Sequence, residues 1–114
     1  MKSKRTKLTD IPPKVKQAVY IRDKGLCIIC GKQGIPNAHY IRRSQGGLGI
    51  EQNIVTLCQK CHHDYDNGQY RQMYGEIIRD YLQSIYKDWN ADDLIYDKWK
   101  DFKIKWQRRN NELH

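Results

Sequence analysis

The sequence is poor in the residues that build a large hydrophobic core. Hydrophobic residues make up 39% of its 114 residues, and Phe102 is its single phenylalanine. A chain of this length is expected to form one domain, here residues 1–114. A domain with so little apolar material usually needs a further source of stability, such as disulfides or a bound metal.

The sequence also has no apolar run long enough to span a membrane, and no apolar stretch follows its basic N-terminus as in a signal peptide. We therefore expect a cytoplasmic protein without a membrane partner. Disulfides are rare in that compartment, so paired CxxC motifs favour a metal site there.

Positive charge is concentrated at the two ends of the chain. Residues 1–24 carry eight Lys/Arg against two Asp, and residues 98–109 carry six against one, whereas residues 25–97 carry seven basic and nine acidic residues. The net charge is +8. A basic protein of this kind favours a polyanion such as DNA or RNA as its partner, with an ordinary solvated surface as the alternative.

Four cysteines form two pairs with the same spacing, Cys27 with Cys30 and Cys58 with Cys61. Structural zinc takes four Cys or His ligands in a tetrahedron, and a two-residue spacer lets both thiolates of a pair reach one ion. A redox dithiol is the alternative for a single pair, but two pairs without a thioredoxin-like βαβ pattern argue against it. The sequence predicts one structural Zn²⁺ that supplies much of the folding free energy.

The local patterns predict a small α+β fold. Residues 1–10 are polar and basic and predict a flexible arm, and Pro12-Pro13 predicts a short helix that ends near Gly25. We expect a ββα unit next, made of strands at 37–41 and 54–57, a glycine-rich loop between them, and a helix from residue 59 to 67.

A helical extension is expected beyond this unit. Apolar residues recur at three- and four-residue steps between Tyr70 and Ile85, which predicts an amphipathic helix with a core-facing stripe. Asn90 is expected to cap a further helix that carries Ile95, Trp99, Phe102 and Trp106 on one face. The domain thus divides into a basic arm over about 1–12, a core over about 20–68 and an extension over about 69–107.

The core resembles the HNH (His-Me finger) nuclease family. The resemblance is carried by Cys27-x2-Cys30, His39-x4-Ser44-Gln45-Gly46-Gly47, Asn53 and Leu57-Cys58-x2-Cys61-His62, and it is closest to small phage-type endonucleases with an Ala-His-Tyr-Ile core. It covers a little under half of the chain. It implies a zinc-stapled ββα-metal core with an N-terminal helix before it and the helical extension after it, in a bacterial or phage-infected host cell.

The resemblance also implies the roles of three residues. His39 would be the general base that activates water, Asn53 would hold it by hydrogen bonding across the loop, and His62 would ligate a catalytic Mg²⁺ or Mn²⁺. Neutral histidine has a suitable pKa for this work, and a divalent cation stabilises the charge that develops on the phosphate. Asp66 follows His62 by four residues, so it shares a helix face with His62 and is expected to be a second ligand.

One position departs from the family pattern. Family members commonly place Asp or His directly before the base as a further metal ligand, whereas this chain has Ala38 there. Either the ion is held by fewer protein ligands, or His39 is itself the ligand and Tyr40 takes the position of the base. The span from His39 to Ser44 favours the first phasing, and a tyrosine of ordinary pKa is a poor base at neutral pH.

The sequence therefore predicts a metal-dependent endonuclease acting on DNA, expected to be double-stranded, as a monomer or a homodimer. The alternative is a catalytically inactive zinc-binding module that binds nucleic acid, and a third hypothesis is a protein-interaction domain built on the Tyr- and Trp-rich helices. The residues expected to contact nucleic acid are basic side chains of the arm, the loop and the C-terminal segment: Lys4, Arg5, Arg42, Arg43, Lys103 and Lys105.

Overall fold

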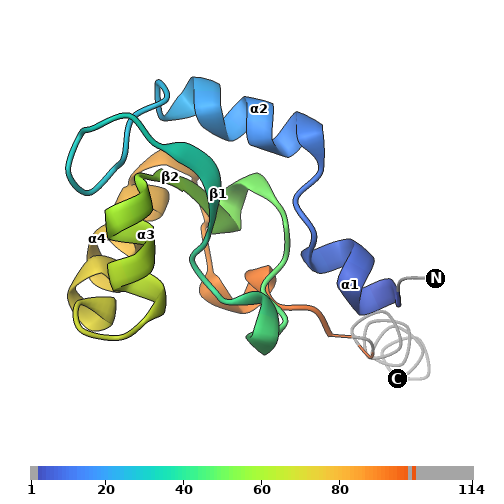
Figure 1. The fold of residues 1–114 in the computed structure, drawn as a ribbon. Helices are drawn as coiled ribbons and strands as arrows, with labels where there is room; N and C mark the ends of the chain where they lie inside the picture. The colour runs from blue at the N-terminus through green and yellow to red at the C-terminus, as the bar shows by residue number, and fades with distance from the viewer. Residues whose placement is uncertain (1–2, 98, 100–114) are drawn as a thin grey trace, which may run out of the picture.

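The computed structural model describes residues 3–97 and residue 99, and it has an α+β fold in which helices surround a two-stranded antiparallel sheet (Figure 1). The expected α+β class is confirmed. In chain order the elements are α1 (Lys4–Thr9), α2 (Pro13–Arg22), β1 (Ile35–His39), the 3-10 turns η1 (Arg43–Gln45) and η2 (Glu51–Asn53), β2 (Ile54–Leu57), α3 (Gln59–Asp66), α4 (Arg71–Ile85) and the 3-10 turn η3 (Ala91–Leu94).

The two strands pair with Ala38 opposite Val55 and His39 opposite Ile54. β2 lies where the apolar β-branched run predicted it, but β1 begins and ends two residues earlier than expected. The chain leaves the strand pairing after His39 because the next two backbone N–H groups bond to Asn53. The N–H of Tyr40 donates to the backbone carbonyl of Asn53 at 2.7 Å, and the N–H of Ile41 donates to the side-chain oxygen of Asn53 at 2.8 Å. This turn places His39 at the end of the sheet.

The core lies between the sheet and helices α3 and α4. All four residues of β2 are buried, as β-branched and apolar residues between packed layers should be. The helix predicted between residues 70 and 85 is present, but its apolar stripe is buried only in part, because Tyr70, Met73, Ile77 and Ile85 are exposed whereas Ile78 and Leu82 are fully buried. These last two pack in one cluster whose buried members are Cys27, Ala38, Val55, Leu57, Cys61, Tyr65, Ile78 and Leu82.

A buried ion pair at the end of α2 ties the helices to β2. The guanidinium of Arg22 donates to the carboxylate of Asp23, whose side chain is fully buried, and also to the backbone carbonyl of Ile54 at 2.7 Å. Asp23 in turn accepts hydrogen bonds from the backbone N–H of Thr56 at 2.9 Å and from the hydroxyl of Tyr81 in α4. Three elements therefore share one polar centre.

The N-terminal segment is more ordered than the expected flexible arm. Ser3 caps α1 by accepting a hydrogen bond from the N–H of Thr6, and the segment packs against the loop after β1, where Gly49 donates to the carbonyl of Leu8 at 2.9 Å. A side chain at Gly49 would not fit, because its Cβ would lie 1.9 Å from the backbone oxygen of Asp10. The prediction of a flexible arm is thus wrong over Lys4–Thr9, for lack of any local sequence signal for this docking.

The C-terminal extension follows the prediction only in part. Asn90 is a cap, accepting from the N–H of Asp92 at 3.0 Å, but it opens a single 3-10 turn. Ile95 is extended and pairs with Gly47 instead of continuing a helical face. Phe102 and Trp106 lie outside the described residues, and Trp99 is 55% exposed. No helix in the described part of the chain is long and apolar enough to cross a membrane.

Candidate functional site

The four cysteines lie together, as the spacing predicted. Their sulfur atoms are all within 4.8 Å of one another, and those of Cys30 and Cys58 are 3.6 Å apart. None of the four is in a disulfide. Thiolates that share one tetrahedral zinc are separated by about 3.8 Å, given Zn–S bonds of about 2.3 Å. The cluster could therefore hold a structural metal such as zinc.

Local backbone structure brings each pair of cysteines to the cluster. The first pair lies in a tight turn, where Gly31 adopts φ +80° and donates to the carbonyl of Cys27 at 2.9 Å. The second pair opens α3, where Cys58 is the N-cap and its sulfur accepts the N–H of Cys61 at 3.4 Å. Burial raises the pKa of Cys58, but hydrogen bonds from Cys61 and the other thiols outweigh it and bring that pKa to about 7. A thiolate at this position is the form that binds metal.

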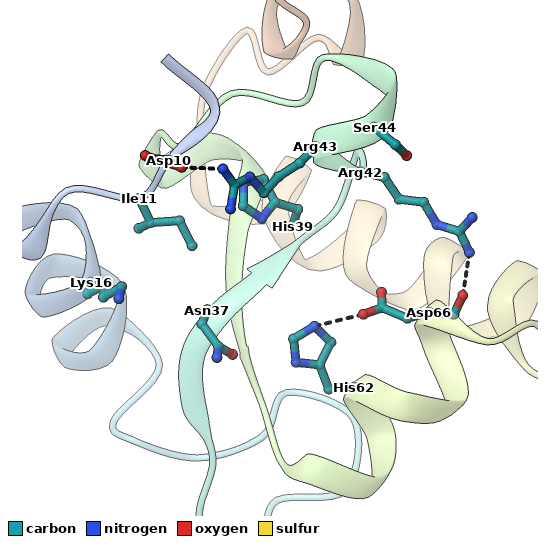
Figure 2. A pocket seen from close by; sticks show the side chains of 10 residues that line it. All are labelled: Asp10, Ile11, Lys16, Asn37, His39, Arg42, Arg43, Ser44, His62 and Asp66. Carbon is teal, nitrogen blue, oxygen red and sulfur yellow. Dashed lines mark hydrogen bonds and ion pairs between the residues drawn. The ribbon is translucent and has the colours of Figure 1, made fainter. Parts of the chain in front are cut away.

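A hollow of about 750 Å³ lies beside the end of β1, and none of the four cysteines lines it (Figure 2). It collects side chains from the segment between α1 and α2, from α2, from β1, from the following loop and from α3. The lining residues are Asp10, Ile11, Lys16, Asn37, His39, Arg42, Arg43, Ser44, His62 and Asp66. The structure thus brings His39, His62 and Asp66 to one hollow.

The imidazole of His39 is half-buried and has a fixed orientation. Its Nε2 atom lies 2.8 Å from the backbone carbonyl oxygen of Thr9. A carbonyl oxygen only accepts, so Nε2 carries the proton and Nδ1 keeps its lone pair. Burial lowers the pKa of His39 below its ordinary value, and the nearby charge of Arg43 lowers it further, although the Thr9 carbonyl opposes both. The lowered pKa therefore favours the neutral form of the ring.

His62 and Asp66 face one another on α3, as the four-residue spacing predicted. His62 Nε2 lies 3.1 Å from Asp66 Oδ2, and Figure 2 shows both groups turned into the hollow. The helix is fixed against the end of β1 by the Tyr65 hydroxyl, which donates to the carbonyl of Tyr40 at 2.6 Å. One buried tyrosine therefore sets the position of the His62–Asp66 pair relative to His39.

Asn53 acts on the loop and not on the His39 ring. Its fully buried amide donates to the carbonyl of Leu48 at 2.8 Å and exchanges hydrogen bonds with the backbone of Ile41. Asn53 was expected to hold His39 by hydrogen bonding across the loop, whereas the partner of its side chain is the loop backbone. The ring of His39 has its hydrogen bond with Thr9 instead.

Ala38 is fully buried in the core, next in sequence to His39 but on the opposite face of β1. Side chains alternate across a strand, so a carboxylate at this position would point into apolar surroundings. The same alternation puts Asn37 in the hollow with His39. Sequence reasoning missed Asn37, although the period-two pattern of a strand would have found it.

The basic residues expected to contact nucleic acid have different surroundings. Arg42 and Arg43 line the hollow, where Arg42 donates to the carbonyl of Asp66 at 2.5 Å and Arg43 pairs with Asp10. Arg5 donates to the carbonyl of Ser44 at 2.9 Å, so it supports the loop while remaining exposed. The others are the exposed Lys4, and Lys103 and Lys105, which lie outside the described residues.

The N-terminal segment contributes side chains that the sequence did not single out. Asp10, Ile11 and Lys16 line the hollow opposite the loop, and Lys16 is exposed. Asp10 and Ile11 lie between α1 and α2, and Lys16 lies in α2, so packing of the N-terminal segment brings all three to residues about thirty positions away. No local pattern predicts such contacts.

Comparison with known proteins adds no family to this description. No protein-family model matches the chain, and no curated protein matches it either.

Proposed function

We propose that the protein is a metal-dependent endonuclease that hydrolyses phosphodiester bonds in double-stranded DNA, stapled by a structural Zn²⁺ at its four cysteines. The observation that carries this proposal is the hollow that joins His39 to the His62–Asp66 pair among basic side chains. His39, as a proton acceptor, and the His62–Asp66 pair, as a candidate ion site, thus line the same hollow. The resemblance of the motifs to HNH nucleases supports the same activity.

In this mechanism His39 takes the proton of the attacking water through Nδ1. The hydrogen bond from Nε2 to the Thr9 carbonyl holds the ring in the tautomer that leaves Nδ1 free, and it stabilises the imidazolium formed when the proton arrives. The lowered pKa of His39 keeps the ring neutral before reaction. Asn53 acts as a positioning residue, because it holds the loop directly after the base.

His62 and Asp66 would hold the catalytic Mg²⁺ or Mn²⁺. Their facing nitrogen and carboxylate oxygen are a donor set that such ions accept. When bound, the ion would supply positive charge that stabilises the transition state and the leaving oxygen. Arg42 fixes the end of α3 through the carbonyl of Asp66, and so helps to hold this pair in place.

DNA would approach over the basic rim of the hollow. Lys16 on one side and Arg42 and Arg43 on the other place positive charge around His39, and the net charge of +8 favours a polyanion. One site hydrolyses one strand at a time. Cutting of both strands therefore requires two copies of the protein or two successive nicks.

A supercoiled plasmid tests the proposal. We expect nicking with Mg²⁺ or Mn²⁺ that EDTA stops, and we expect His62→Ala to abolish nicking while DNA affinity measured by fluorescence anisotropy is retained. His63→Ala is the matched control, because His63 is the exposed neighbour on the same helix. The burial of Ala38 favours one rival, a silent DNA-binding module, because it leaves the ion one ligand short of the family pattern. That rival predicts DNA binding without nicking in any divalent ion.

A further inference from the structure

We propose that Asn37 is a third protein ligand of the catalytic ion, binding it through the side-chain oxygen Oδ1. This inference rests on the proposed function, since it deepens the description of the same ion site. Its starting point is that Oδ1 of Asn37 is buried and has no hydrogen-bond partner in the described part of the chain. A buried carbonyl oxygen without a partner is uncommon in folded proteins, and such an oxygen often binds an ion or an ordered water molecule.

Asn37 lies where a ligand would be needed. The hollow that contains His39 and a second one of about 490 Å³ share three lining residues, which are Asn37, His62 and Asp66. These three side chains therefore stand at the junction of the two hollows. In Figure 2 the oxygen of Asn37 is turned toward the His62 ring, which faces Asp66 in turn.

The separation of the His62–Asp66 pair suits an ion. Two adjacent ligand atoms of an octahedral Mg²⁺ with bonds of about 2.1 Å are about 3.0 Å apart. The observed distance from His62 Nε2 to Asp66 Oδ2 is 3.1 Å. An ion could therefore bind both atoms at their observed separation. An amide oxygen beside them adds a hard ligand of the type that Mg²⁺ and Mn²⁺ prefer.

Asn37 also accounts for the position of Ala38. β1 sends Ala38 into the core and Asn37 into the hollow, so the strand offers its oxygen ligand one residue earlier than the family pattern would place it. The other unpaired buried oxygen, Oγ1 of Thr56, belongs to a fully buried side chain that lines neither hollow in the described part of the chain. Of these two oxygens, the one of Asn37 thus belongs to a residue that lines the hollow.

Mn²⁺ binding, followed by electron paramagnetic resonance and calorimetry on the zinc-loaded full chain, tests this proposal without activity. The cysteine cluster will not compete, because thiolates favour zinc over Mn²⁺. Asn37→Leu should weaken Mn²⁺ binding about tenfold or more, and Asn37→Asp should strengthen it, because a carboxylate keeps the oxygen and adds charge. Asn67→Leu is the control, an exposed asparagine at the second hollow whose amide bonds to His63. It should bind like the wild type.

The two proposals fail in different ways. If His62→Ala loses Mn²⁺ while both Asn37 variants bind it like the wild type, Asn37 is not a ligand although the ion site stands. If His62→Ala binds Mn²⁺ like the wild type, the ion site itself is wrong and the role of Asn37 falls with it. Circular dichroism and bound zinc show that each variant is folded, and Asn37→Asp carries the test if Asn37→Leu does not fold.

Discussion

The Nε2 atom of His39 hydrogen-bonds to the backbone carbonyl of Thr9 at 2.8 Å, across a separation of thirty residues. The N-terminal segment is therefore part of the candidate site around His39. Its other contacts lead to the same loop: Arg43 pairs with Asp10, and Gly49 donates to the carbonyl of Leu8. The orientation of the His39 ring thus depends on the docking of this segment.

Gly49→Ala should reduce nicking by disturbing this docking. The added Cβ would meet the backbone oxygen of Asp10 at 1.9 Å, so the segment must move and the Thr9 carbonyl with it. We expect a loss of about tenfold to a hundredfold in kcat, with Mn²⁺ affinity unchanged, because a misplaced base loses part of its contribution of about 10²–10⁴.

Gly75→Ala is the control for that substitution. Its Cβ would lie 3.6 Å from the Tyr65 ring, an ordinary contact, and alanine favours a helix interior over glycine. We expect unchanged nicking and an equal or higher melting temperature. Full activity of Gly49→Ala would show that the Thr9 carbonyl is not needed to orient His39.

The rate of nicking should fall in acid with a midpoint below pH 6.5, the ordinary pKa of histidine. Burial lowers the pKa of His39, and a base works only when neutral, so activity is kept down to that lowered pKa and lost below it. Arg43→Gln should move the midpoint to higher pH, because it removes a positive charge that lowers the pKa. The measurement is single-turnover nicking against pH. A wild-type midpoint at or above 6.5 would contradict a buried neutral base.

Removal of the structural metal should unfold the protein. Zinc binding contributes about 10 kcal/mol or more in small finger domains, which is as large as the whole stability of a typical domain. We expect one zinc per chain by mass spectrometry, and loss of the cooperative thermal transition in Cys58→Ser or after strong chelation. His63→Ala should keep its zinc, since that side chain is exposed. A Cys58→Ser variant that melts like the wild type would rule out a stabilising metal at this cluster.

Asp23→Asn should destabilise the fold without touching the site. It leaves the charge of Arg22 without its partner in a largely buried setting, where breaking an ion pair costs about 3–5 kcal/mol. The free energy of unfolding in urea measures this loss. Asp88→Asn is the control, because Asp88 is exposed and asparagine tolerates its positive φ. Equal stability of the two variants would show that the Arg22–Asp23 centre does not hold α2, β2 and α4 together.

Features set by short-range patterns could be predicted from the sequence. The CxxC pairs meet, the run Ile54–Leu57 is a buried strand, and His62 and Asp66 face one another because four residues make about one helical turn. Each of these depends on spacing within a single element, or on the chemistry of one residue type. The sequence therefore predicted the cluster and half of the candidate site.

Features that depend on contacts between different segments of the chain could not be predicted from the sequence. The side-chain amide of Asn53 hydrogen-bonds to the backbone of Ile41 and Leu48. Because Ile41 is bonded in this way, β1 ends earlier than its residues suggested. The Thr9 carbonyl reaches His39 only after the N-terminal segment has docked. Backbone groups carry no sequence signature, because every residue has them, so their partners follow from the fold alone.

The nicking rate of His39→Ala, set beside that of the wild type and His63→Ala at matched zinc content, tests the central claim most directly. The proposed mechanism predicts metal-dependent nicking by the wild type and His63→Ala, and a loss of about 10²–10⁴ in His39→Ala with DNA and Mn²⁺ binding unchanged. Nicking by His39→Ala at the wild-type rate would show that His39 is not the base.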